Sequence, residues 1–161
     1  MKPSLLQQCV GLAVFVLICF AAAGLGGLVT ASAIPNWYAG IAKPTWNPPN
    51  WIFGPVWSCL YLMMAIAAWL VWRQAVLARA KLPLALFAIQ LVLNSLWSVL
   101  FFGLHSPGMA AVEIILLWAA ILATLIAFWR RSQWAGGLLV PYLVWVTFAA
   151  VLNVAIWRLN A

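Results

Sequence analysis

Acidic residues are almost absent from this chain of 161 residues, which has one Asp or Glu against eight Lys and Arg. Only 6% of its residues are charged and 68% are hydrophobic, whereas about a quarter of a typical soluble domain is charged. So few charges cannot cover the surface of such a chain in water. The composition therefore predicts an integral membrane protein.

Residues for metal binding, disulfide bonding and acid–base chemistry are equally scarce. Cys9, Cys19 and Cys59 are isolated and form no CxxC pair, so we expect neither a disulfide framework nor a metal site. His105, the only histidine, could ligate a haem iron, although a solvated histidine in a turn is the better interpretation. One carboxylate, Glu113, cannot form an acid–base pair, so no conventional enzyme is expected.

The formal charge of +7 raises the question of a nucleic-acid partner. The basic residues gather at the ends of apolar segments, where they meet anionic lipid headgroups, and no basic stripe alternates with exposed aromatic residues. We therefore expect membrane lipid as a partner and no nucleic acid.

Long apolar runs are abundant. Because a membrane span needs roughly 20 apolar residues, the chain predicts an all-α membrane protein, one domain over residues 1–161, with a bundle of five transmembrane helices. The first segment resembles a signal peptide at its end, but we interpret it as an uncleaved span. The expected spans cover residues 5–30, 51–76, 82–103, 109–129 and 134–157, with a long structured loop at 31–50.

The distribution of basic residues predicts the orientation in the membrane. One side collects more of them than the other, which carries Lys43 and Arg158. By the positive-inside rule, the N-terminus is cytoplasmic, and the first loop and the C-terminus are outside. The residues of the more basic side are Lys2, Arg73, Arg79, Lys81, Arg130 and Arg131.

Polar and aromatic residues share faces of three expected helices. Polar side chains in a membrane helix turn toward the bundle, because lipid offers them no partner. The faces predict one aromatic cavity with a few amide groups, a recipe for a small-molecule site; the alternative is that they only hold the helices together. The sets are Gln90, Asn94, Trp97 and Ser98; Trp145, Ala149, Leu152 and Asn153; and Trp57 with Tyr61.

Three further features have two interpretations each. Glu113 is either a functional intramembrane acid or a residue stabilised by the positive end of its helix. Lys43 either pairs with a ligand carboxylate or extends to lipid headgroups. A strip of small residues, Ala119, Ala123 and Ala127, favours dimerisation or internal helix packing equally.

The stretch WYAGIAKPTWNPPNW at residues 37–51, followed by Pro-Val-Trp, strongly resembles the signature of the TspO/translocator-protein family, also called the peripheral benzodiazepine receptor family. QLVLNSLWSVLFFG at 90–103 and VPYLVWVTFAAVLN at 140–153 extend the resemblance over essentially the whole chain. It implies a five-helix bundle, commonly a homodimer. It also implies binding of porphyrins such as protoporphyrin IX and of isoquinoline-carboxamide or benzodiazepine-type drugs, with a link to cholesterol in animal members.

The resemblance also implies a ligand site, with the first loop as a lid over a pocket among the helices. Light-dependent porphyrin degradation in some bacterial members implies a photochemical role for Trp57 and Trp145. By motif, the pocket residues are Trp57, Asn94, Trp97, Trp145, Ala149 and Leu152, and the lid residues are Trp46, Pro48 and Pro49.

Two departures from the family pattern matter. Asn50 stands where the family often has arginine, which removes a partner for porphyrin carboxylates or loop carbonyls. The segment 151–158 lacks the tyrosine of the sterol-associated pattern of animal members, and that pattern is weak evidence even when intact. Both departures favour a bacterial member.

The sequence therefore predicts a tetrapyrrole-binding membrane sensor or scavenger in porphyrin homeostasis and stress. Porphyrin, protoporphyrin IX or haem, is expected as a ligand, and no cofactor is required. The alternatives are a transporter of porphyrin, sterol or lipid across the membrane and a structural or partner-regulating membrane protein.

Overall fold

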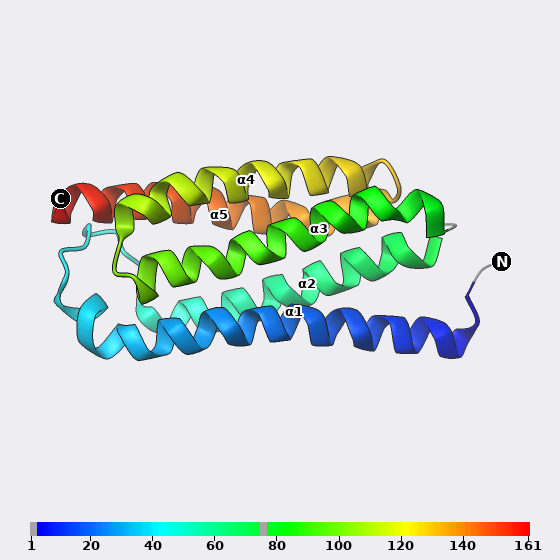
Figure 1. The fold of residues 1–161 in the computed structure, drawn as a ribbon, viewed down its shortest axis with the longest axis horizontal. Coiled ribbons are helices and arrows are strands. Elements are labelled where there is room, and N and C mark those ends of the chain that lie inside the picture. Colours follow the sequence, from blue (N-terminus) through cyan, green and yellow to red (C-terminus); the bar gives the residue numbers. More distant parts are fainter. Residues whose placement is uncertain (1–2, 75–76) are drawn as a thin grey trace.

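The chain folds into a bundle of long helices that run side by side (Figure 1). The structure is a computed structural model that describes residues 3–74 and 77–161. Within these residues five helices are long and apolar enough to cross a membrane, which confirms the predicted all-α membrane fold. The elements are α1 (Leu5–Ala33), a π-helical turn η1 (Ile34–Tyr38), α2 (Asn50–Gln74), α3 (Leu77–Ser98), a second π-helical turn η2 (Val99–Gly103), α4 (Pro107–Trp129) and α5 (Gln133–Asn160).

Local sequence signals set the starts of three helices. Ser4 and Gln7 form a capping box, in which each side chain bonds the backbone of the other at the start of α1. Pro107 occupies the first turn of α4, where its missing N–H has no intrahelical partner to lose. The Ser132 hydroxyl accepts a bond from the Ala135 N–H at the start of α5.

The first loop is shorter than expected. We expected irregular chain from residue 31, but α1 continues to Ala33 and η1 carries the helical path to Tyr38. Pro35 has no N–H to bond the carbonyl four residues earlier, and its ring crowds that carbonyl, so the chain widens into a π-helical turn instead of ending. The irregular connection is left with little more than residues 41–49.

Other helix ends also extend past the expected spans. α3 begins five residues before 82 and α5 continues three residues past 157, because backbone hydrogen bonds continue a helix into its polar flanks. Residues 75–76 of the expected second span lie outside the described residues, as do Lys2 and the side chain of Arg79.

Packing places α1 at one edge and α4 at the other. α4 packs against α3 and α5, while α1 packs against α2 and α3. The core between them includes Met64, Ile121 and Tyr142, none of which is exposed. The two chain ends lie at opposite ends of the bundle (Figure 1), and the side of the membrane that each end faces stays a prediction.

Candidate functional site

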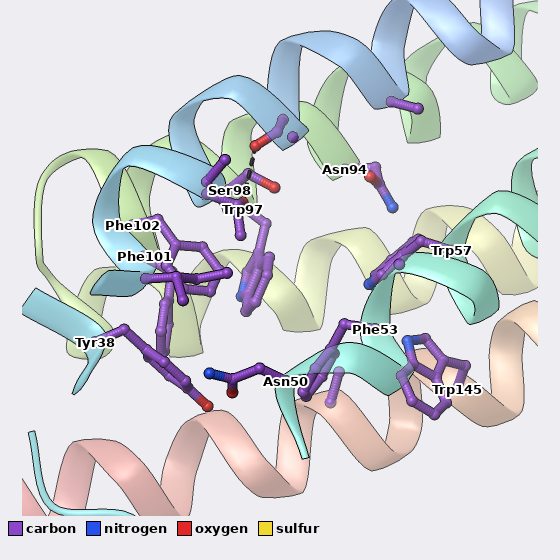
Figure 2. A pocket seen from close by; sticks show the side chains of 18 of the residues that line it. Tyr38, Asn50, Phe53, Trp57, Asn94, Trp97, Ser98, Phe101, Phe102 and Trp145 are labelled. Carbon is purple, nitrogen blue, oxygen red and sulfur yellow. Dashed lines mark hydrogen bonds between the residues drawn. The ribbon is translucent and has the colours of Figure 1, made fainter. Parts of the chain in front are cut away.

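A cavity of about 500 Å³ lies inside the bundle, between α1, α2, α3 and α5. Figure 2 shows aromatic side chains around the cavity, interrupted by a few amide and hydroxyl groups. Among the described residues, α4 contributes nothing to the lining and no charged side chain takes part in it. The cavity is therefore an uncharged, mostly apolar space, rich in aromatic side chains, at the depth of the membrane-spanning helices.

Six of the sequence-predicted site residues line this one cavity. They come from three helices, α2, α3 and α5, whose polar and aromatic faces were expected to line one cavity. They are Trp57, Asn94, Trp97, Trp145, Ala149 and Leu152.

The three residues predicted for the lid lie elsewhere. Trp46, Pro48 and Pro49 do not line the cavity, and neither does any other residue from 39 to 49. The Trp46 ring packs edge-on against Phe148, with ring centroids 6.0 Å apart. Trp46 also borders a shallow groove along the outer side of α5, beside Arg158. In this structure the loop crosses the end of the bundle, and its residues 39–49 form no part of the cavity wall.

A buried chain of hydrogen bonds forms one end of the cavity. The Tyr61 hydroxyl donates to Asn94 Oδ1 at 2.6 Å, and Asn94 Nδ2 donates to the Tyr142 hydroxyl at 2.8 Å. The Tyr142 hydroxyl in turn donates to Gln90 Oε1 at 2.9 Å. Tyr61 and Asn94 face the cavity, whereas Gln90 and Tyr142 lie behind it. Asn94 therefore belongs to the wall of the cavity and also ties α2, α3 and α5 together.

A second polar contact holds the wall formed by α3 and α5. Trp97 Nε1 donates to Asn153 Oδ1 at 2.9 Å, and Asn153 Nδ2 donates to the Pro107 carbonyl at 2.8 Å. The Trp97 ring stacks on Phe101, with centroids 5.1 Å apart. These bonds fix the Trp97 ring as a flat cavity wall and join α3, α5 and the start of α4.

Trp57 and Trp145 stand on neighbouring helices beside the cavity (Figure 2). The Trp57 ring lies 5.8 Å from the Tyr61 ring and 6.2 Å from the Tyr142 ring. The Trp145 ring packs against Phe53 at 5.9 Å. Its Nε1 is buried without a hydrogen-bond partner among the described residues.

Sequence reasoning missed the whole wall that α1 supplies. Phe20, Ala23, Gly26, Gly27 and Thr30 line the cavity, yet α1 is apolar all round and offers no polar face to mark its inner side. Tyr38, Phe53 and Phe101 were missed as well. Asn50 lies at the same end of the cavity as Tyr38 (Figure 2).

Lys43 proves to be part of the loop's own structure. Its ammonium group donates to the Tyr38 carbonyl at 2.6 Å and to the Ile41 carbonyl at 2.7 Å, and lies 4.8 Å from the centre of the Tyr38 ring. It does not line the cavity. In the structure, Lys43 thus bonds carbonyls at the end of η1 and just after it, and the two interpretations considered from the sequence stay predictions.

Glu113 and His105 also lie off the cavity. Glu113 is the seventh residue of α4, only 5% exposed, and both its carboxyl oxygens lack a partner among the described residues. His105 is exposed and stacks on Trp37, with ring centroids 4.6 Å apart. No cluster of three or more His, Cys, Asp or Glu within the described ranges could hold a metal ion.

Comparison with known proteins identifies the family. The TspO/MBR family matches residues 15–158. The tryptophan-rich protein TspO of Chlorobaculum tepidum is 42% identical over 158 residues, which cover 96% of this chain and 98% of that protein. Human translocator protein is 43% identical over 127 residues, covering 78% and 75%. The tryptophan-rich sensory protein of Cereibacter sphaeroides is 40% identical over 146 residues, covering 91% and 89%. With five membrane-spanning helices and relatives that match most of its length, the chain belongs to the TspO/MBR family of integral multi-pass membrane proteins.

Proposed function

We propose that this protein binds a tetrapyrrole, with protoporphyrin IX as the reference ligand, and acts as a membrane sensor or scavenger of porphyrins. The cavity carries the proposal: its volume of about 500 Å³ falls within the roughly 300–1,000 Å³ of small-molecule sites. An uncharged aromatic wall suits a flat apolar ring system. The name of the Cereibacter relative, tryptophan-rich sensory protein, supports the sensor role.

The lining suggests how such a ligand would lie. The faces of Trp57 and Trp97 offer flat apolar surface to the macrocycle. Since none of the described residues that line the cavity is a cation, the two carboxylates of a porphyrin would extend toward the Asn50 end. There the Asn50 amide can donate a hydrogen bond. No cofactor is needed for binding.

We include light-dependent degradation of the bound porphyrin in the proposal. Its support is the position of Trp57 and Trp145 on the cavity wall, where both rings would contact the ligand. Illumination of the complex should lower the porphyrin absorbance faster than illumination of free porphyrin. If the Trp57→Phe and Trp145→Phe variants bleach the bound porphyrin at the wild-type rate, these residues are not reactive participants.

Titration with protoporphyrin IX tests the binding proposal. Tryptophan quenching of the detergent-solubilised protein should saturate, and Trp57→Phe, Trp145→Phe and Asn94→Ala should each weaken binding. Trp134→Phe is the matched control, because Trp134 is 83% exposed and does not line the cavity. Absence of saturable binding refutes the proposal; binding that all three variants leave intact refutes the assignment of the site.

Transport is the second candidate function. Its support is the name of the human relative, translocator protein. A transporter of porphyrin, sterol or lipid should move its substrate into proteoliposomes faster than protein-free vesicles do, and a sensor should not. Assembly as a homodimer stays a prediction, which light scattering of the solubilised protein can test.

A further inference from the structure

The lining of the cavity includes side chains that also face outward into the membrane region. Phe20 on α1 is 41% exposed and Trp51 on α2 is 73% exposed, and both line the cavity. The smaller lining residues beside them are exposed as well. We call six of these exposed lining residues the portal: Phe20, Gly27 and Ala31 on α1, with Trp51, Gly54 and Ser58 on α2.

The spacing of α1 and α2 explains why the portal is open. A Cβ atom added at Gly27 or at Gly54 would meet nothing within 4 Å. At the other end of the same helix pair, a Cβ added at Gly11 would lie 2.5 Å from the Trp72 ring. The two helices are therefore tightly packed at the start of α1, and side chains leave open space between them beside the cavity.

Among the described residues, hydrogen bonds between α1 and α2 are likewise found at the tightly packed end and not beside the cavity. At the packed end, Trp69 Nε1 donates to the Gln8 carbonyl at 2.9 Å. Beside the cavity, no side-chain hydrogen bond joins these two helices within the part of the chain that the structure describes, and the Thr30 hydroxyl bonds back to Gly26 in its own helix. An apolar molecule can therefore pass between α1 and α2 without breaking a side-chain hydrogen bond between them.

Unlike the portal, the other boundaries of the cavity are held by helix packing and by hydrogen bonds. α4 covers the side of α3 and α5 that faces away from the cavity. The loop at the end of the bundle is tied to α5 by two bonds, from the Ala42 N–H to Asn160 Oδ1 at 3.0 Å and from Asn160 Nδ2 to the Ala42 carbonyl at 2.9 Å. The bonds of Lys43 fix the same loop from within.

We propose that the cavity is loaded sideways from the hydrocarbon of the bilayer, through the portal between α1 and the first half of α2. Its ligand is then a planar apolar molecule that dissolves in the membrane before it binds, not one captured from water beneath the loop. The inference rests on the proposed function for the identity of the ligand.

Binding kinetics in lipid nanodiscs test the route. We would fill the portal with Gly27→Leu/Gly54→Leu and follow tryptophan quenching by protoporphyrin IX. The matched control is Gly24→Leu/Gly137→Leu, which adds the same two side chains at open positions off the cavity. Forcing a ring system past the added leucines should slow both association and dissociation by about tenfold, while the control keeps the wild-type rates.

Two results would overturn the route. An unchanged association rate in the filled variant, or a faster dissociation rate, means that the ligand does not pass the portal. The second test releases the loop with Asn160→Ala, which removes both bonds to Ala42. We expect this variant to bind and release at wild-type rates; faster binding and release would show passage beneath the loop.

A lipid probe separates this inference from the proposed function. If the wild-type protein binds no porphyrin, the proposed function fails, but the portal is still testable with lipids brominated in the middle of their acyl chains. The fluorescence of Trp57, taken as the difference between the wild type and Trp57→Phe, should be quenched. Gly27→Leu/Gly54→Leu should remove that quenching. If Trp57 is not quenched in the wild type, or if it is still quenched in the double-leucine variant, the proposed route through the portal is wrong.

Discussion

The hydrogen bond between Tyr61 and Asn94 should couple the two residues measurably in the stability of the bundle. Asn94 is 4% exposed and Tyr61 is 5% exposed. Asn94→Ala removes the acceptor of the Tyr61 hydroxyl and one donor to Tyr142, whose own hydroxyl still bonds Gln90. Tyr61→Phe removes only the first bond. Each single change therefore leaves one cavity-facing polar group without its partner.

The expected magnitudes follow from hydrogen bonds between membrane helices, which contribute on average about 0.6 and at most about 1.7 kcal/mol each. With two bonds lost, Asn94→Ala should lower the free energy of unfolding by about 1–3 kcal/mol. Tyr61→Phe should lower it by roughly 0.6–1.7 kcal/mol. In the double variant neither residue is left without its hydrogen-bond partner. Its unfolding free energy should therefore exceed the value expected from adding the two single effects by roughly 0.6–1.7 kcal/mol.

Reversible unfolding in mixed detergent–SDS micelles, followed by circular dichroism, measures all four proteins of this cycle. The control cycle pairs Asn94→Ala with Thr124→Ala, because the Thr124 hydroxyl bonds only the Ala120 carbonyl of its own helix. The control pair should be additive within about 0.5 kcal/mol. If the Tyr61–Asn94 pair is equally additive, the buried chain does not hold the cavity wall, and our account of Asn94 is wrong.

Three further predictions concern the cavity end, a glycine contact and the buried acid. Asn50→Arg should tighten binding of protoporphyrin IX by about fivefold, since a cation gains a charge-assisted bond to a carboxylate worth about 1 kcal/mol at an exposed site; the dimethyl ester of the same porphyrin should show no gain in a parallel titration. Gly136→Ala should destabilise the bundle by about 1–3 kcal/mol, because its Cβ would lie 2.8 Å from the Trp129 Cα. Gly137→Ala, which meets nothing within 4 Å, should be neutral or stabilising in the same unfolding assay. Glu113→Gln should keep or raise the unfolding free energy, since it removes an acid buried without a partner; a loss above about 2 kcal/mol would show that the carboxyl group has a structural role.

The polar residues of α3 show what periodicity can predict. Spacing placed Gln90, Asn94 and Trp97 on one face, and all three do turn toward the bundle. Spacing could not show that Asn94 and Trp97 reach the cavity while Gln90 lies one layer deeper against Tyr142. The depth of a side chain depends on the neighbouring helices, whose arrangement the periodicity of α3 does not contain.

The residues around Pro35 show why the loop boundary was misplaced. Several prolines and asparagines predicted an irregular connection, and residues 41–49 are irregular. Trp37 and Tyr38 are not, because a single missing N–H at Pro35 can be accommodated by a wider helical turn. Tyr38 thereby reaches the cavity from η1, a placement that no turn signal in the sequence indicates.

The two interpretations of the polar faces, helix attachment and ligand site, turn out to be compatible. An open space inside a bundle tends to collapse unless its walls are held apart, since each void forfeits packing contacts. Here the amides of Asn94 and Asn153 fix α2, α3 and α5 in place, and the space between them stays open because those bonds would break on collapse. α1 has no comparable bond to α2 beside the cavity in the described part of the chain, and its link to α3 there is a long contact of 3.5 Å from the Ser95 hydroxyl to the Ala22 carbonyl. The least restrained wall of the cavity is thus α1, the helix whose inner face sequence periodicity could not identify. We expect α1 to move away from α2 when a ligand enters.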